Sequence, residues 1–179
     1  LSSSLDFVVI GRFSQQKRLD LLVRFFEQTP RPFPAASLHF FGGVNRQALL
    51  HYITKIDKQA ASQVEFHGFQ QGLWDKIANE LNQVHIIASA WEDPGHAILE
   101  GLNFGVPSVF VNPRANYISF YRQLPISECD IMVHPRDTFV KRAIESAFQS
   151  DLRHNLRDDI VRQFSFTEVE KNLAKVLGV

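Results

Sequence analysis

The chain has 179 residues, of which 45% are hydrophobic and 21% charged, a composition typical of one globular domain with a sizeable core. Lys plus Arg and Asp plus Glu both number 19, and the resulting net charge of zero gives no electrostatic basis for binding nucleic acid. The single cysteine, Cys129, excludes an internal disulfide and a paired-cysteine zinc site, and no apolar run reaches the ~18 residues of a membrane span.

Short apolar runs alternate with segments of helical periodicity along the chain. The runs predict strands at residues 7–10, 38–41, 64–68, 84–88, 106–111 and 131–133. The periodic segments predict helices at residues 19–26, 46–58, 74–81, 94–104 and from 137 onward, with a less regular stretch at 117–128. Arg153, Arg157 and Arg162 are expected on a solvated face. The alternation predicts a Rossmann-like doubly wound parallel sheet with helices on both faces and a helical carboxyl-terminal end.

In such sheets ligands bind at the carboxyl ends of the strands. Polar and glycine-containing segments follow four of the predicted strands and should converge on one cleft: Gly11-Arg12, Gly42-Gly43, Gly68-Phe69 and residues 89–95. In the first of these loops, Arg12 and Lys17 supply two cations that could neutralise a diphosphate. The loop has only one glycine and lacks the Gly-x-Gly-x-x-Gly fingerprint of nicotinamide enzymes.

Glu92 and Glu100 bracket the predicted start of a helix. Asp93 is a suitable N-cap and Pro94 a suitable first helical residue. The first backbone N–H groups of that helix, those of Gly95, His96 and Ala97, would face a phosphate. The two carboxylates should lie on the order of 10 Å apart, too far for a retaining glycosidase pair, and they suit the hydroxyl groups of a sugar and a ribose.

The seven histidines do not predict a metal site, because none shows the i, i+4 spacing of a helical zinc site. His39, His67 and His85 fall within predicted strands, where packed core or strand-end positions are expected. His96 differs, because it would lie in the first turn of the ligand-facing helix and could donate a hydrogen bond to a phosphate or to a sugar hydroxyl.

These residues occur in an order and spacing that resembles a known family. The matching segments are 9–13, 17–20, 64–68, 88–89, 92–100 and 105–107, continuing through 133–137 to 164–167. The chain resembles the carboxyl-terminal half of retaining GT-B glycosyltransferases of family 4, the glycosyl transferases group 1 type. The resemblance covers nearly the whole chain, and the Glu-x7-Glu signature is specific in this context.

The resemblance implies a role for each site residue. Arg12 and Lys17 would stabilise the leaving diphosphate, and Glu92 would orient the donor sugar. Glu100 would bind the ribose, while the backbone at Gly95, His96 and Ala97 would meet the phosphates. The chain departs from many relatives in having Asp93-Pro94-Gly95 where they have Gly-Phe-Gly, and in having His96 at a commonly aliphatic position. Both departures bear on the identity of the donor sugar.

The resemblance further implies that residues 1–179 are a single donor-binding domain of a longer, two-domain hexosyltransferase. Its donor would be a nucleotide-diphosphate sugar such as a UDP-sugar, used in polysaccharide biosynthesis without a cofactor or metal. The acceptor, a saccharide or a lipid-linked saccharide, would bind to an absent amino-terminal domain, so the isolated domain should bind donor and transfer little. A cytoplasmic location is expected, and peripheral association of the full-length protein with the inner face of the cytoplasmic membrane is compatible with this family type.

Two alternatives remain open at the level of sequence. One is a sugar-nucleotide binding or epimerase-type relative, in which the same fold holds a donor for different chemistry. The other is a non-catalytic interaction domain that kept the fold and lost the chemistry.

Overall fold

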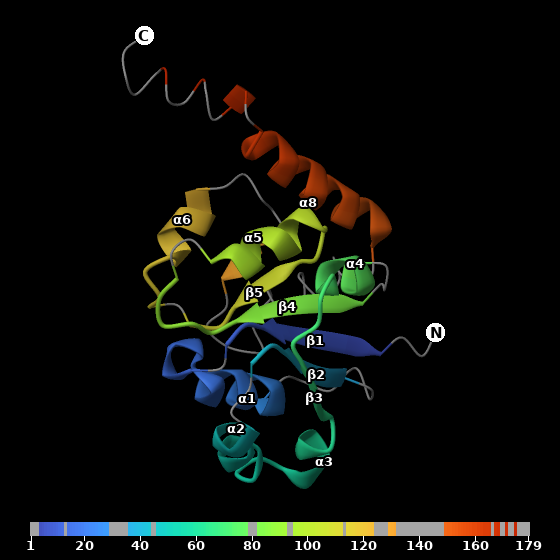
Figure 1. Cartoon of the computed structure of the whole chain (residues 1–179), viewed down its shortest axis with the longest axis vertical. Coiled ribbons are helices and arrows are strands. Elements are labelled where there is room, and N and C mark those ends of the chain that lie inside the picture. Colours follow the sequence, from blue (N-terminus) through green and yellow to red (C-terminus); the bar gives the residue numbers. More distant parts are fainter. Residues whose placement is uncertain are drawn as a thin grey trace.

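A computed structural model describes residues 4–12, 14–28, 36–43, 46–78, 82–92, 95–112, 114–123, 129–131, 149–165, 167–168, 171 and 174. Within these residues, six parallel strands form one sheet in the order β3-β2-β1-β4-β5-β6 (Figure 1). The strands are β1 (Leu5–Ile10), β2 (Ala36–Phe41), β3 (Val64–Gly68), β4 (Gln83–Ile87), β5 (Ser108–Phe110) and β6 (Cys129–Ile131). This order confirms the predicted doubly wound, Rossmann-like sheet.

Helices connect the strands, as the alternation predicts. They are the 3-10 turn η1 (Gln15–Lys17) and the α-helices α1 (Leu19–Gln28), α2 (Arg46–Ile53), α3 (Lys58–Ala61), α4 (Leu73–Ala78), α5 (His96–Asn103), α6 (Ile118–Gln123) and α8 (Ser150–Gln163). The helix predicted at 46–58 is divided in two, because Asp57 caps a new helix by accepting hydrogen bonds from the backbone of Gln59 and Ala60. The stretch 117–128 is not wholly irregular, since α6 lies within it. Of the helical region predicted from residue 137, residues up to 148 lie outside the described part.

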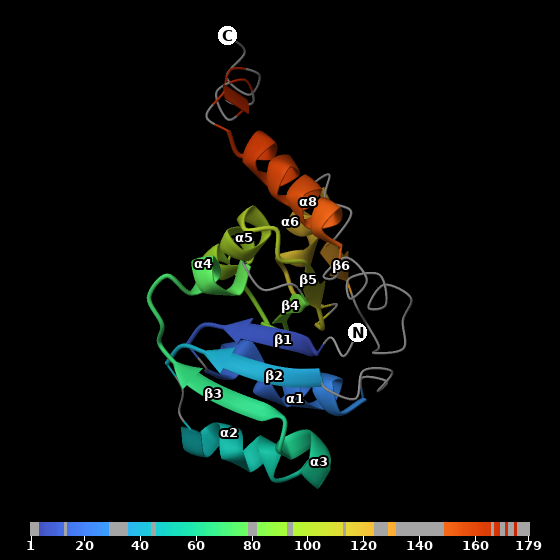
Figure 2. The ribbon, with the colours of Figure 1, turned by 90° about the vertical axis from the view of Figure 1, so that its right-hand side faces the viewer.

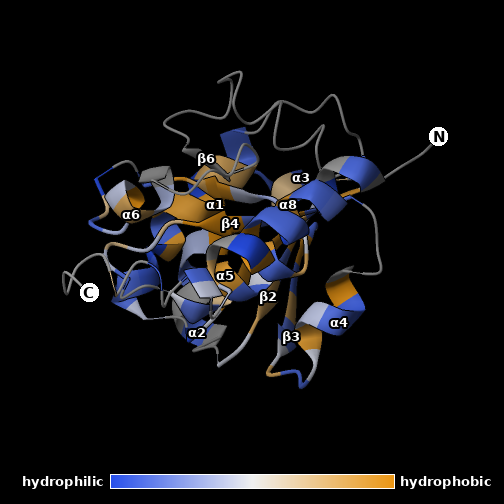
Figure 3. Ribbon diagram, turned by 90° about the horizontal axis from the view of Figure 1, so that it is seen from above, coloured by the Kyte–Doolittle hydropathy of each residue, from blue (hydrophilic) through white to orange (hydrophobic). Residues whose placement is uncertain are grey.

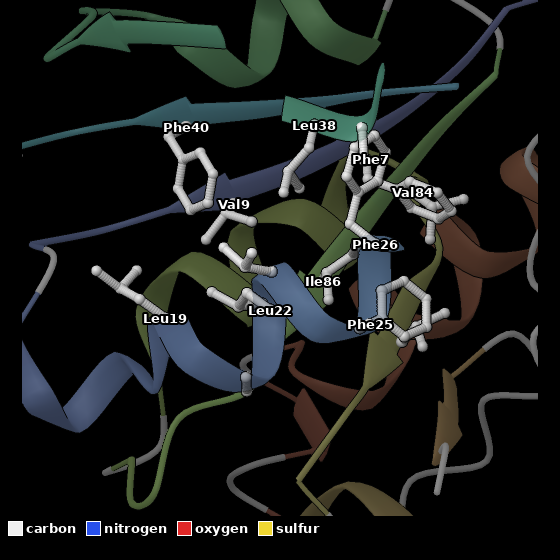
Figure 4. Close-up of a cluster of buried hydrophobic side chains, with 14 of the residues drawn as sticks. Phe7, Val9, Leu19, Leu22, Phe25, Phe26, Leu38, Phe40, Val84 and Ile86 are labelled. Atoms are coloured by element: carbon white, nitrogen blue, oxygen red, sulfur yellow. The ribbon is translucent and has the colours of Figure 1, made fainter. Parts of the chain in front are cut away.

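One face of the sheet packs against α1. The helix buries Leu19, Leu22, Val23 and Phe26, which follow the i, i+3, i+4, i+7 spacing of a single helical face. These side chains meet alternate residues of β1, β2 and β4, among them Phe7 and Phe40 (Figure 4). The Phe7 ring contacts that of Phe25 edge to face at 5.4 Å between centroids. This cluster is the main hydrophobic core.

The opposite face packs against α4 and α5 (Figure 1). Val8 meets Trp74 and Ile77 of α4, while Ile87 and Phe110 meet Ile98 of α5 in a cluster that also includes residues of α6 and α8. From above, the strands at the centre are mostly hydrophobic and the outward turns of the helices mostly hydrophilic (Figure 3). The sheet is thus covered on both faces, as a parallel sheet requires.

The helix α8 corrects the expectation of a solvated arginine face. Arg157 and Arg162 are exposed, whereas Arg153 is buried and its Nε donates a hydrogen bond to the carbonyl of Gly105 at 3.0 Å. Burial lowers the pKa of Arg153. Sequence periodicity could not distinguish the buried Arg153 from the exposed Arg157 and Arg162, because the partner of Arg153 is the backbone carbonyl of Gly105, 48 residues away.

Backbone hydrogen bonds join the loops that follow the first three strands. The N–H of Gly11 donates to the carbonyl of Phe41, and the N–H of Gly42 donates to the carbonyl of Gly68. Gly42 has a φ of 129°, and a Cβ there would lie 2.1 Å from the Gly11 carbonyl oxygen. Only glycine therefore allows this close approach. The loops at the carboxyl ends of β1, β2 and β3 form one connected rim.

Candidate functional site

The loop after β1 is docked on the loop after β4. The backbone carbonyl of Gln16 accepts a hydrogen bond from the N–H of Ala90 at 2.8 Å. The side-chain Nε2 of Gln16 donates a hydrogen bond to the carbonyl of Trp91 at 2.7 Å. Beside these contacts the Lys17 ammonium forms an ion pair with the Glu92 carboxylate, and both side chains are largely buried. The predicted cation of the first loop and the predicted sugar-orienting carboxylate are therefore direct partners.

Two side chains from beyond β5 also hold the loop after β4 in place. The carbonyl of Ser89 accepts hydrogen bonds from Asn112 Nδ2 at 3.1 Å and from the Tyr117 hydroxyl at 3.0 Å. Burial, and then the negative charge of Glu92, raise the pKa of Tyr117, which keeps the hydroxyl protonated as a donor. Sequence reasoning missed both side chains, because they act on a backbone atom more than 20 residues away.

The helix α5 starts two residues later than predicted. Its N-cap is Gly95, with a φ of 77° and no side-chain capping bond, and His96 is the first helical residue. Asp93 is therefore not the N-cap, and Pro94 is not the first helical residue; both lie outside the described residues. A Cβ at Gly95 would lie 2.9 Å from Ile98 Cδ1 and 3.3 Å from Glu92 Cβ, so the left-handed turn and the tight packing both require glycine.

A cavity of about 640 Å³ opens between the carboxyl ends of β1 and β4, at the point where the strand order reverses. Six of the predicted site residues line it: Arg12, Lys17, Glu92, Gly95, His96 and Ala97. The first N–H groups of α5 lack acceptors within the helix and carry its positive dipole end. The cavity thus combines two cations, a helix N-terminus and one carboxylate.

The remaining predicted residue, Glu100, lies in a neighbouring cavity of about 560 Å³. Its carboxylate accepts a hydrogen bond from Trp74 Nε1 at 3.0 Å. Gly42, Gly43 and Phe69 line this second cavity, and the Phe69 ring is 84% exposed. Ile10, Gly11 and Arg12 line both cavities, so Arg12 stands between them. Glu92 and Glu100 therefore line different cavities.

His85 lies in the wall of the first cavity and is fully buried, which agrees with its predicted core position. Burial, and to a smaller extent the nearby charge of Lys17, lower its pKa to about 3. The ring contacts Trp74 edge to face at 5.3 Å between centroids. A neutral imidazole therefore faces the cavity across the physiological pH range.

His39 and His67 are close to one another rather than separate strand residues. His39 Nδ1 lies 2.9 Å from His67 Nε2, and both side chains line a third cavity, of about 230 Å³. The sequence rule applied to histidines compares positions within one helix, so it could not detect a pair formed across two strands.

Within the described residues, no helix has the length and apolar character needed to cross a membrane.

Comparison with known proteins assigns the family. Residues 2–120, about two thirds of the chain, match the family described as Glycosyl transferases group 1. The chain belongs to this family. No curated protein matches the sequence. The arrangement of cations, helix N-terminus and two glutamates is therefore found in a glycosyltransferase domain.

Several solved structures share the fold. The lipopolysaccharide outer core galactosyltransferase WaaB matches with a TM-score of 0.70 and 16% identity over 97% of this chain and 49% of its own. Anabaena HepE, solved in complex with UDP-glucose, matches with a TM-score of 0.66 and 17% identity over 98% of this chain and 49% of its own. The chain thus spans about half the length of these proteins.

One solved structure is of similar extent to this chain. The catalytic domain of cholesterol-alpha-glucosyltransferase from Helicobacter pylori matches with a TM-score of 0.62 and 16% identity, over 88% of this chain and 98% of its own. At these identities the likeness shows the fold alone.

Proposed function

We propose that this chain is the donor-binding, carboxyl-terminal half of a retaining glycosyltransferase that uses a nucleoside-diphosphate sugar. The observation that carries the proposal is the pair of adjoining cavities joined at Arg12, with the cations and the α5 N-terminus in one and Glu100 in the other. The length of the chain relative to WaaB and HepE supports its assignment as one half of such an enzyme.

The first cavity suits the diphosphate and the sugar. Arg12 can hold phosphate oxygens through its planar guanidinium, and Lys17 adds a point charge beside the N-terminus of α5. Negative charge grows on the diphosphate as the bond to the sugar breaks, and cations already in position stabilise that charge. Glu92, at the same cavity, can accept hydrogen bonds from sugar hydroxyls and so orient the ring.

The second cavity suits the nucleoside. The Glu100 carboxylate, oriented by Trp74, can accept hydrogen bonds from both hydroxyls of a ribose. The exposed Phe69 ring offers a flat surface for a nucleobase. UDP is the first nucleotide to test, because HepE was solved with it. The acceptor would bind to another domain, and peripheral association with a membrane would be a property of the complete protein.

Calorimetric titration of the chain with UDP and with inorganic pyrophosphate tests this assignment. Arg12→Ala and Lys17→Ala should each weaken both ligands by about tenfold, since each removes a cation from the phosphate site. Glu100→Ala should weaken UDP and leave pyrophosphate unchanged. Arg24→Ala, at an exposed position of α1 that lines neither cavity, is the matched control. Unchanged UDP binding in both Arg12→Ala and Glu100→Ala would refute the assigned site.

A further inference from the structure

A second group of chemically active side chains lies on the sheet away from the two donor cavities. Strand pairing places Val8, His39 and Glu65 in register across β1, β2 and β3. Asp6 and His67 lie on the same face, since they line one cavity together with Val8 and His39. Figure 2 looks onto β2 and β3 with α1 behind them. Two histidines and two carboxylates thus share one patch of the sheet, opposite α1.

The register between β2 and β3 shifts at His67. Phe40 pairs with Phe66, but Phe41 pairs with Gly68, so His67 is the extra residue of β3. A bulged residue leaves the regular ladder, and bulges are known to re-aim side chains at functional sites. The His67 ring stacks on Phe41, with centroids 4.5 Å apart, and its Nε2 is directed at His39.

Three ligand-type atoms converge at this patch. His39 Nδ1 and His67 Nε2 are 2.9 Å apart, and Glu65 Oε2 lies 3.7 Å from the first and 3.6 Å from the second. Zinc bonds of about 2.0–2.1 Å in tetrahedral geometry separate neighbouring ligand atoms by about 3.4 Å. The mean of the three separations is close to that value. A small rotation of the imidazole rings would open the short His39–His67 contact to the required distance.

A second carboxylate lies behind one of the two histidines. The other ring nitrogen of His39, Nε2, lies 3.6 Å from Asp6 Oδ1. A carboxylate behind a metal-binding histidine orients the ring and selects the tautomer that leaves the opposite nitrogen free. Asp6 is placed to do this for His39.

We propose that His39, Glu65 and His67 form a binding site for a divalent transition metal ion, with zinc favoured by the two-histidine, one-carboxylate ligand set. The adjoining cavity of about 230 Å³ leaves room for a fourth ligand such as water. Lys76 lines the same cavity, where Gln70 Oε1 lies 3.4 Å from its ammonium. None of the three ligands lines either donor cavity, so the proposal does not depend on the donor assignment.

Metal titration of the tag-free, chelator-treated chain tests the site. Competition with a chromophoric chelator should reveal one tight equivalent of Zn²⁺, and Co²⁺ should give the intense visible absorption of a tetrahedral centre. Mg²⁺, a hard cation that prefers oxygen ligands, should not compete. Asp6→Asn should weaken Zn²⁺ binding by about 10- to 100-fold, the usual effect of removing a carboxylate behind a histidine ligand.

Variants of the ligands complete the test. Joint replacement of His39 and His67 by Ala should abolish the tight equivalent. Glu65→Gln should weaken it, and because this side chain is 57% exposed the variant should stay folded even if the double variant does not. His51→Ala is the matched control, since His51 is exposed on α2 and contacts Lys55. Tight Zn²⁺ binding that survives in Glu65→Gln at full strength, or that is lost equally in His51→Ala, would overturn the proposal.

Discussion

At the scale of single residues, the ion pair between Lys17 and Glu92 sets the charge of the proposed phosphate site. Lys17 is one of two cations in the first cavity, and in the ligand-free chain its charge is balanced by Glu92. A diphosphate must share Lys17 with this carboxylate. The proposed sugar-orienting residue therefore opposes binding of a nucleotide that carries no sugar.

Glu92→Gln should accordingly strengthen the binding of UDP and reduce the preference for UDP-sugar over UDP. Removing the carboxylate frees Lys17, and UDP should bind about tenfold more tightly, a gain of about 1.4 kcal/mol. The preference for UDP-sugar over UDP should fall, because the sugar hydroxyls lose an acceptor. Calorimetry with both ligands at low salt measures the two effects. Glu168→Gln disrupts a Lys–Glu pair at 2.8 Å that lines neither cavity, and should leave both affinities unchanged; weaker UDP binding in Glu92→Gln would contradict the argument.

His85 is expected to lower the stability of the folded chain at acid pH. Its pKa falls from the ordinary 6.5 to about 3 in the folded chain, so between these values the unfolded chain binds the additional proton. Stability from this residue is complete above pH 6.5 and is lost as pH falls toward 3, at about 1.4 kcal/mol per pH unit. Urea unfolding of wild type and His85→Phe across this range measures the difference in slope. Parallel pH profiles would show that His85 does not titrate as described.

At the scale of elements, the turn into α5 depends on a single glycine. The left-handed conformation of Gly95 and its contacts with Ile98 and Glu92 leave no space for a Cβ. We expect Gly95→Ala to cost about 1–2 kcal/mol of unfolding free energy and to weaken UDP binding, because the N-terminus of α5 would shift. Gly43→Ala, where the nearest atom to a Cβ is 3.9 Å away, is the stability control. Equal stability of Gly95→Ala and wild type in chemical denaturation would contradict this account.

The elements that sequence predicted well are those whose signal is local. The apolar run at 64–68 coincides with β3, and the stripe from Leu19 to Phe26 marks the buried face of α1. The start of α5 was misplaced because Asp93 and Pro94 are good local signals for a helix start. The actual start is set by the conformation of Gly95 and by packing against Glu92 and Ile98, which are tertiary features.

At the scale of the whole molecule, the strand order explains why the predicted residues come together. Chain connections reverse direction between β1 and β4, and the loops that follow these two strands supply Arg12 and Glu92. Alternation of strand and helix was sufficient to predict this convergence. It could not predict that Arg12 lines two cavities, nor that His67 contacts His39 next to a shift of register between β2 and β3, because both depend on packing between distant segments.

The length of the chain leads to a prediction about activity. It spans about half of WaaB and HepE, and in the proposed enzyme the acceptor binds to another domain. The isolated chain should therefore bind a UDP-sugar yet transfer little or no sugar to a saccharide acceptor. Chromatography of donor and acceptor after prolonged incubation measures this. Appreciable transfer would contradict the proposal that the acceptor binds to another domain. Conversion of the donor sugar without acceptor would favour the epimerase-type alternative.

The hydrogen bond from Trp74 to Glu100 has a practical consequence. The chain has only two tryptophans, and the other, Trp91, is 56% exposed. In a Trp91→Phe variant, Trp74 would be the sole indole, buried and bonded to the carboxylate proposed to hold the ribose. Indole emission responds to a nearby charge and to its hydrogen-bond partner, so fluorescence of this variant would report occupation of the nucleoside cavity directly. The Trp91→Phe variant would thus carry an optical sensor for the proposed nucleoside site.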